Sequence, residues 1–259
     1  MKEVYVYNQA AWDAQVARGN TWTQPVSQEA INKARRGDWG IVLTNRRKVP
    51  VTWFPNLHEC RILCLAAGGG QQAPILAAAG AKVTLLDASR AQLDQDRMVA
   101  ERDGLDLTLV QGDMAQLPSL FDRASFDVIF NPVSNCFVPE LEPVWQGCAK
   151  VLSEGGRLLS GFFNPWYFVF DERAHQDGRL EVRHAIPYHD GMLTDEEIQA
   201  LRDQDEPFVF GHTLDDQIGG QMRAGFALIQ MYEDVTGDKV IDQFGPSFLA
   251  TLSVKWDVS

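Results

Sequence analysis

The sequence predicts an α/β protein with a doubly wound sheet of about seven strands, mostly parallel, that ends in an antiparallel hairpin. Three observations predict this fold. Five short apolar runs alternate with helix-like segments between residues 61 and 163, as in consecutive β–α–β units. The first run ends in three glycines, a turn at which the backbone can approach a ligand closely. Two further strands, 226–232 and 248–256, flank a turn-like segment and form the hairpin.

The N-terminal sixty residues differ from this pattern, because they place several tryptophans among polar residues. Two helices are expected there, over 8–18 and 27–36, and Ser27 is a suitable N-cap for the second. Pro50 and Pro55 interrupt the segment that follows. We therefore expect a helical cap over residues 1–58 and the sheet domain over residues 59–259.

The elements of the sheet domain follow in order. Strands are predicted over 61–66, 82–87, 107–111, 126–130 and 157–163, and helices over 71–79, 90–102 and 141–152. Ser89 and Gln92 fit a capping box at the start of the second of these helices. Gly155 and Gly156 are expected to end the third helix.

After the fifth strand the alternation stops, and residues 164–211 are predicted to be an insertion that covers the substrate. This segment carries three prolines, several aromatic residues and a short acidic helix at about 195–203. A last helix is expected to open at Thr213, with Asp215 and Asp216 in its first turn, and to end near Arg223.

Charge and composition limit the partners of the chain. Its 259 residues carry a formal net charge of −12, which argues against nucleic acid and against anionic membrane surfaces. No apolar run is long enough to span a membrane, and the N-terminus does not resemble a signal peptide. The four cysteines form no CxxC pair and have no metal-spaced histidine. We expect a cytoplasmic protein with reduced thiols and no metal site. The sequence predicts no particular oligomeric state.

Two acids stand where strands end. Asp87 ends the second strand, and Asp113 follows the third strand after Gly112. Because the carboxyl ends of parallel strands meet at one edge of a sheet, these acids should lie beside the glycine turn. A carboxylate can accept two hydroxyl hydrogens at once, so the pattern predicts a nucleoside site. A helix-capping role for Asp87 and an Asx-turn at Asp113 are the alternatives.

Taken in order, these residues resemble the class I S-adenosylmethionine-dependent methyltransferases, most closely their type 11 small-molecule group, over about residues 61–256. The resemblance implies a Rossmann-like sheet. Members usually show an acid followed by three alternating glycines after the first strand. Here Cys64 stands at the acid, Ala66 at the first glycine, and Gly68 and Gly70 at the other two. In the family, that acid helps to position the ligand through local hydrogen bonds.

The resemblance implies S-adenosylmethionine as the cofactor. Asp87 matches the acid that binds the ribose hydroxyls, and Asp113 matches the acceptor for the adenine amino group. Met114 matches the apolar neighbour of the ring. The residues expected to bind the cofactor are Ala66, Gly68, Gly70, Asp87, Ala88, Gly112, Asp113, Met114 and Asn131.

The expected substrate-binding residues are Ser134, Asn164, Tyr188 and His189. Amino-methylating relatives carry Asn/Asp-Pro-Pro-aromatic after the fourth strand, and here Val133 and Ser134 depart from it, so amine specificity is not predicted. His189 has the chemistry of a general base, or it is a surface histidine. The cap aromatics Trp12, Trp22, Trp53 and Phe54 either close over the cofactor or pack in the cap.

The predicted function is transfer of a methyl group from S-adenosylmethionine to a small-molecule acceptor by in-line displacement. No catalytic residue is assigned, because the methyl donor is already activated and the protein mainly aligns the reactants. One alternative is an NAD-dependent oxidoreductase, although the Gly-x-Gly-x-x-Gly spacing for a pyrophosphate is missing. The other is a non-catalytic protein that binds S-adenosylmethionine on the same fold.

Overall fold

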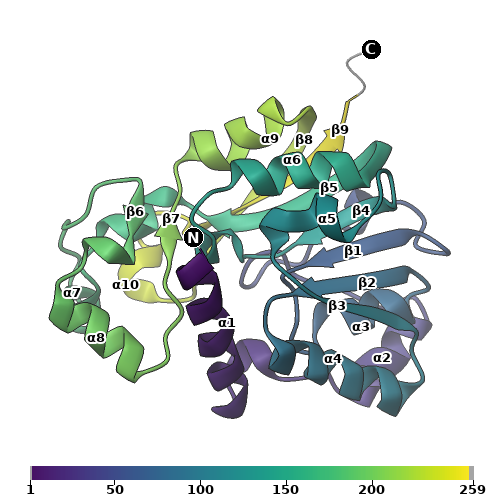
Figure 1. The fold of residues 1–259 in the computed structure, drawn as a ribbon, viewed down its shortest axis with the longest axis horizontal. Helices are drawn as coiled ribbons and strands as arrows, with labels where there is room; N and C mark the ends of the chain where they lie inside the picture. The colour runs from purple at the N-terminus through teal and green to yellow at the C-terminus, as the bar shows by residue number, and fades with distance from the viewer. Residues whose placement is uncertain (1, 257–259) are drawn as a thin grey trace.

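A computed structural model describes residues 2–256, and it confirms the predicted sheet. The seven strands lie in the order β3-β2-β1-β4-β5-β9-β8 (Figure 1). Strands β1 to β5 are parallel, and β9 is antiparallel to both of its neighbours, β5 and β8. The strands are β1 Arg61–Leu65, β2 Lys82–Asp87, β3 Leu107–Gln111, β4 Phe126–Asn131, β5 Leu152–Phe163, β8 Phe226–Asp234 and β9 Phe248–Lys255.

Helices cover both faces of the sheet (Figure 1). On one face lie α2 Gln28–Arg35, α3 Gln72–Ala78 and α4 Arg90–Asp103; on the other lie α5 Leu117–Leu120, α6 Glu142–Val151 and α9 Gly220–Arg223. The central strand β1 shows why. Ile62 and Cys64 belong to one hydrophobic core, Leu63 and Leu65 to the other, and all four are fully buried. A parallel strand buried on both faces reads as a continuous apolar run.

Three elements differ most from their expected bounds. Helix α1, Lys2–Ala17, begins six residues earlier than predicted. Strand β5 begins at Leu152 and runs through the two glycines expected to end the preceding helix, because the chain bulges out where the β4–β5 register shifts. The last helix is divided into a π-helical turn, Asp215–Gly219, and α9.

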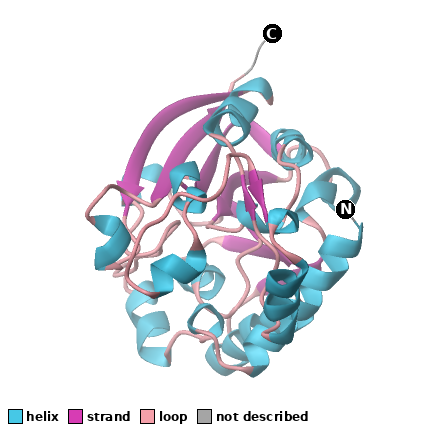
Figure 2. Ribbon diagram, turned by 90° about the vertical axis from the view of Figure 1, so that its left-hand side faces the viewer, coloured by secondary structure: helices cyan, strands magenta, loops and turns pink. Residues whose placement is uncertain are grey.

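The carboxyl edge of the sheet is covered by α1 and by the segment after β5 (Figure 2). That segment holds α7 Glu172–Gln176, the β6–β7 pair at Tyr188–His189 and Phe210–Gly211, and α8 Asp195–Asp203, which matches its predicted bounds. Helix α10, Lys239–Asp242, lies in the β8–β9 connection at the same end of the molecule (Figure 1). Within residues 2–256, no helix has both the length and the apolarity that crossing a membrane requires.

Candidate active site

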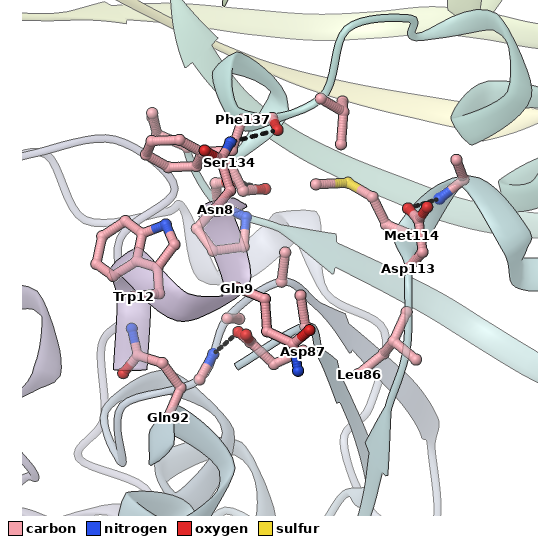
Figure 3. Close-up of a pocket in the computed structure, with 18 of the residues that line it drawn as sticks. Asn8, Gln9, Trp12, Leu86, Asp87, Gln92, Asp113, Met114, Ser134 and Phe137 are labelled. Atoms are coloured by element: carbon pink, nitrogen blue, oxygen red, sulfur yellow. Dashed lines mark hydrogen bonds between the residues drawn. The ribbon is translucent and has the colours of Figure 1, made fainter. Parts of the chain in front are cut away.

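A cavity of about 940 Å³ lies at the carboxyl edge of the parallel strands (Figure 3). Its walls come from the turn after β1, the end of β2, and the loops after β3 and β4, and α1 contributes another wall. This is the edge at which open α/β sheets bind ligands. The volume lies near the top of the range of about 300–1,000 Å³ typical of small-molecule sites. It has room for a nucleoside and a second small molecule.

Asp87 is held in place at the end of β2. Its Oδ2 accepts a hydrogen bond from the backbone N–H of Gly68 at 2.9 Å, and its Oδ1 accepts one from Ser89 at 2.9 Å. Ser89 therefore forms only half of the predicted capping box: its hydroxyl accepts the N–H of Gln92, but its own N–H is bound to Asp87. Each oxygen of Asp87 keeps a lone pair for a ligand hydroxyl.

Asp113 and its neighbours form the wall beyond Asp87. The Oδ1 of Asp113 accepts the N–H of Ala115 at 2.9 Å, so the Asx-turn considered from the sequence is present. In the described part of the chain no hydrogen bond reaches its Oδ2, which leaves this oxygen for a ligand. Met114 lies beside it in the cavity wall (Figure 3). A Cβ at Gly112 would come within 2.8 Å of Leu120 Cδ1, so a glycine at this position leaves room for the Leu120 side chain.

The backbone N–H groups of the glycine turn, residues 68–70, already donate to two acids of the protein itself. Gly68 donates to Asp87, while Gly69 and Gly70 both donate to the Oδ2 of Asp96 at 2.9 Å. A dinucleotide site needs such N–H groups free for its phosphates. This turn therefore does not offer the pyrophosphate cradle of an NAD-dependent oxidoreductase.

The structure brings most of the predicted cofactor residues to one cavity. Its lining includes Ala66, Gly68, Asp87, Ala88, Gly112, Asp113, Met114 and, from the predicted substrate set, Ser134. Their roles toward the cofactor stay predictions.

Five predicted residues do not line the cavity: Gly70, Asn131, Asn164, Tyr188 and His189. Asn131 is fully buried and donates to Asn135, whereas Asn164 donates to the carbonyl of Pro246. The hydroxyl of Tyr188 donates to Asp190 inside the insertion, and His189 is exposed.

Several lining residues are absent from the predicted site. Tyr5 and Gln9 line the cavity from α1, and Phe163 and Phe248 line it from the ends of β5 and β9. A sequence signal existed for Gln9, which is one turn before Trp12 on the expected helix; Tyr5 preceded the expected helix start. Of the four cap aromatics, Trp12 and Trp22 line the cavity, whereas Trp53 and Phe54 are buried in the core.

Comparison with known proteins decides the family. A model of the methyltransferase domain matches residues 63–160. The chain is 48% identical over 256 residues to YbaJ of Bacillus subtilis (strain 168), named an uncharacterized methyltransferase; the match covers 98% of this chain and 100% of YbaJ. This chain belongs to the methyltransferases. S-adenosylmethionine is its cofactor, and the acids and apolar walls of the cavity fit that molecule.

Solved structures share the fold of this methyltransferase. An S-adenosylmethionine-dependent methyltransferase from Mesorhizobium loti has a TM-score of 0.60 at 18% identity, covering 78% of this chain and 94% of that one. The 1,6-didemethyltoxoflavin-N1-methyltransferase of Burkholderia thailandensis, solved with S-adenosylhomocysteine, has a TM-score of 0.59 at 13% identity. That match covers 99% of this chain and 90% of the other.

The affinity of the methyltransferase for its cofactor should depend on pH through Asp87. Burial raises the pKa of Asp87 to about 6, although the N–H bonds from Ser89 and Gly68 oppose the shift. In the predicted arrangement the ribose hydroxyls donate to the carboxylate, so the association constant should fall about tenfold per pH unit below pH 6 and level off above it. In the protein without cofactor, the raised pKa of Asp87 acts on folding stability in the opposite direction: low pH favours the folded state, whereas it weakens cofactor binding. The free energy of unfolding falls as the pH rises from 3.8 to about 6, because the folded state binds the proton more tightly.

Calorimetric titrations with S-adenosylmethionine from about pH 5 to pH 8 measure this profile. The variant Asp87→Asn, which cannot ionise, is the matched control and should bind weakly with no break near pH 6. A wild-type affinity that is constant across this range would show that Asp87 does not bind the cofactor in its ionised form.

Proposed function

We propose that this methyltransferase acts on a small, largely apolar acceptor that is uncharged or cationic. The charge of the cavity carries the proposal. The lining residues, all of them within 2–256, include no lysine, arginine or histidine, whereas they include Asp87, Asp113 and Glu140. An anionic acceptor would lose its hydration there without gaining a counter-charge.

The apolar part of the cavity is where the acceptor would lie. Phe163 and Phe248 enter it from neighbouring strands, and their rings pack together with centroids 4.6 Å apart. Val133 and Ser134 come from the loop after β4. The hydroxyl of Ser134 donates to Asn131 at 2.8 Å, which fixes that loop. These walls exclude water and orient the acceptor toward the cofactor.

When bound, S-adenosylmethionine supplies a methyl group on a sulfonium, already activated for displacement. Asp87 would hold the ribose, while Asp113 and Met114 would hold the adenine. Because no lysine or histidine among the described residues lines the cavity, the attacking atom should need no deprotonation before it attacks. Uncharged aromatic nitrogens satisfy this condition better than thiols, phenols and aliphatic alcohols do.

We also propose that the cap, 1–58, and the insertion, 164–211, close the site of the 59–259 domain together. None of residues 164–211, all of which the structure describes, lines the cavity. The insertion instead holds α1: the side chain of Asn8 donates to the carbonyl of Phe208 and accepts its N–H. At its other end α1 is fixed by Asp13, which accepts from the Ser89 hydroxyl and the Ala91 N–H. The insertion would therefore cover the substrate through α1. A cytoplasmic location stays a prediction.

Paired acceptors test the proposed charge class. In each pair the nucleophile is the same and one member carries an added carboxylate, for example 4-methylpyridine and pyridine-4-carboxylate, whose ring nitrogens attack without a negative charge. Release of S-adenosylhomocysteine should give the uncharged member a kcat/KM at least about tenfold higher, since an unpaired anion is costly to bury. The variant Val133→Lys, which adds a cation to the wall, should shift the preference toward the carboxylate. An equal or reversed preference in the wild type would contradict the proposal.

A further inference from the structure

Asp96 of α4 is an acid of the glycine turn that lies outside the cavity. Its Oδ2 accepts the N–H groups of both Gly69 and Gly70 at 2.9 Å. Both glycines have positive φ, +110° and +72°, so their N–H groups point away from the directions that a regular helix would give them. One carboxylate oxygen therefore fixes two consecutive peptides of the turn.

Burial of the Asp96 carboxyl group is energetically unfavourable. Asp96 is 0% exposed, and no ion pair in the described part of the chain involves it. Its Oδ1 has no hydrogen-bond partner among residues 2–256. Burial raises the pKa of Asp96 to about 8, and the negative charge of Asp87 adds to the shift against the opposing N–H bonds of the two glycines. An apolar side chain here would avoid the cost of burying an acid, but it would leave the N–H group of Gly70 without this acceptor.

Strand β1 offers no acid beneath the turn. Cys64 stands there instead, fully buried. Burial, and after it the charge of Asp96, raises the pKa of the Cys64 thiol, so this group stays protonated. A thiol is a weak acceptor and cannot hold two peptide N–H groups. The carboxylate that β1 lacks is thus supplied from α4.

We propose that Asp96 is the positioning residue of the cofactor turn, performing from α4 the task that an acid at the end of β1 would perform. The three residues that precede Gly69 in the chain line the cavity: Ala66, Ala67 and Gly68. On its other side it rests against the cap: Val26 donates to the carbonyl of Gly70, and a Cβ on Gly69 would come within 2.6 Å of the carbonyl of Trp22. Asp96 therefore fixes a turn that contacts the cap on one side and adjoins the cavity on the other.

The test compares the binding of S-adenosylmethionine and S-adenosylhomocysteine to four forms of the full chain by calorimetry. It rests on the binding of this cofactor in the cavity. Asp96→Ala should weaken both ligands about 10- to 100-fold, because the oxygen that accepts two buried N–H groups is lost. Asp96→Asn keeps an oxygen acceptor and should lose less. Val99→Ala removes a buried side chain from the same helix and should lower the melting temperature without weakening either ligand.

The fourth form moves the acid back to the strand. Cys64→Asp combined with Asp96→Ala should bind the cofactor more tightly than Asp96→Ala alone. Wild-type affinity in a folded Asp96→Ala protein would overturn the proposal, as would equal losses in Val99→Ala or in Asp96→Asn. If the double variant does not fold, the comparison of Asp96→Ala with Val99→Ala decides. Failure of the wild type to bind would instead contradict the cofactor assignment itself.

Discussion

Replacement of Asp87 by alanine is expected to abolish methyl transfer and to weaken S-adenosylmethionine binding by at least about 100-fold. Two hydroxyl hydrogen bonds to a carboxylate contribute about 1.5–3 kcal/mol each, so their loss corresponds to about 3–6 kcal/mol. The variant also leaves the N–H groups of Gly68 and Ser89 without their acceptor. The turn after β1 and the start of α4 would then lose their shared anchor, which adds to the effect.

Calorimetry with S-adenosylmethionine and S-adenosylhomocysteine measures the effect of Asp87→Ala on binding. Asp94→Ala is the matched control: this acid lies on the exposed side of α4, where it pairs with Arg90 and Arg97. Surface pairs of this kind contribute little, so binding should be unchanged. Normal cofactor affinity in a folded Asp87→Ala protein would remove Asp87 from the site.

Gly161→Ala should destabilise the protein by about 3 kcal/mol and raise the KM for the acceptor. Gly161 lies in β5 directly against the cap, and a Cβ there would come within 2.0 Å of the carbonyl oxygen of Leu43. The clash is with backbone, so the cap segment must move, and overpacking of this kind costs about 1–3 kcal/mol or more. That segment includes Val42 and Thr44, which line the cavity. The same displacement should therefore open the wall.

Thermal unfolding should register the change at Gly161 as a fall in Tm of about 6–12 °C for a chain of this size. Gly178→Ala is the control, because Gly178 has φ +80° but a Cβ there would meet nothing within 4 Å. It isolates backbone strain, which costs about 1 kcal/mol. A loss at Gly161 no greater than at Gly178, with an unchanged KM, would show that the cap does not set the shape of the cavity.

The meeting of the glycine turn and Asp87 at one edge of the sheet could be predicted because it is local in sequence. A buried strand, its glycine turn and the acid that ends the next strand lie within about thirty residues. The register Leu65↔Leu86 then places Gly68 against Asp87. The substrate end depends on tertiary packing. Asn164 and Tyr188 belong to the segment after β5, yet their polar groups bond to Pro246 and Asp190 instead of facing the cavity.

Two other residues were missed for different reasons. Tyr5 precedes the predicted start of α1, because Val4, Val6 and the flanking tyrosines have low helix propensity, and contacts with the insertion override that preference. The role of Asp96 gave no signal in the sequence. Together with Gln92, Val99 and Asp103 it forms a stripe at helical spacing, and the structure buries all four. Three of these four side chains are polar or charged, which in a sequence is the pattern of a solvent-facing side.

The structure of the wild-type protein with S-adenosylhomocysteine tests the central claim most directly. We expect the ribose hydroxyls within about 3 Å of the Asp87 carboxylate and the adenine beside Asp113 and Met114. The sulfur should then face the apolar wall of Phe163 and Phe248. A ligand bound elsewhere, or one whose ribose does not contact Asp87, would contradict the assignment of this cavity as the site of methyl transfer.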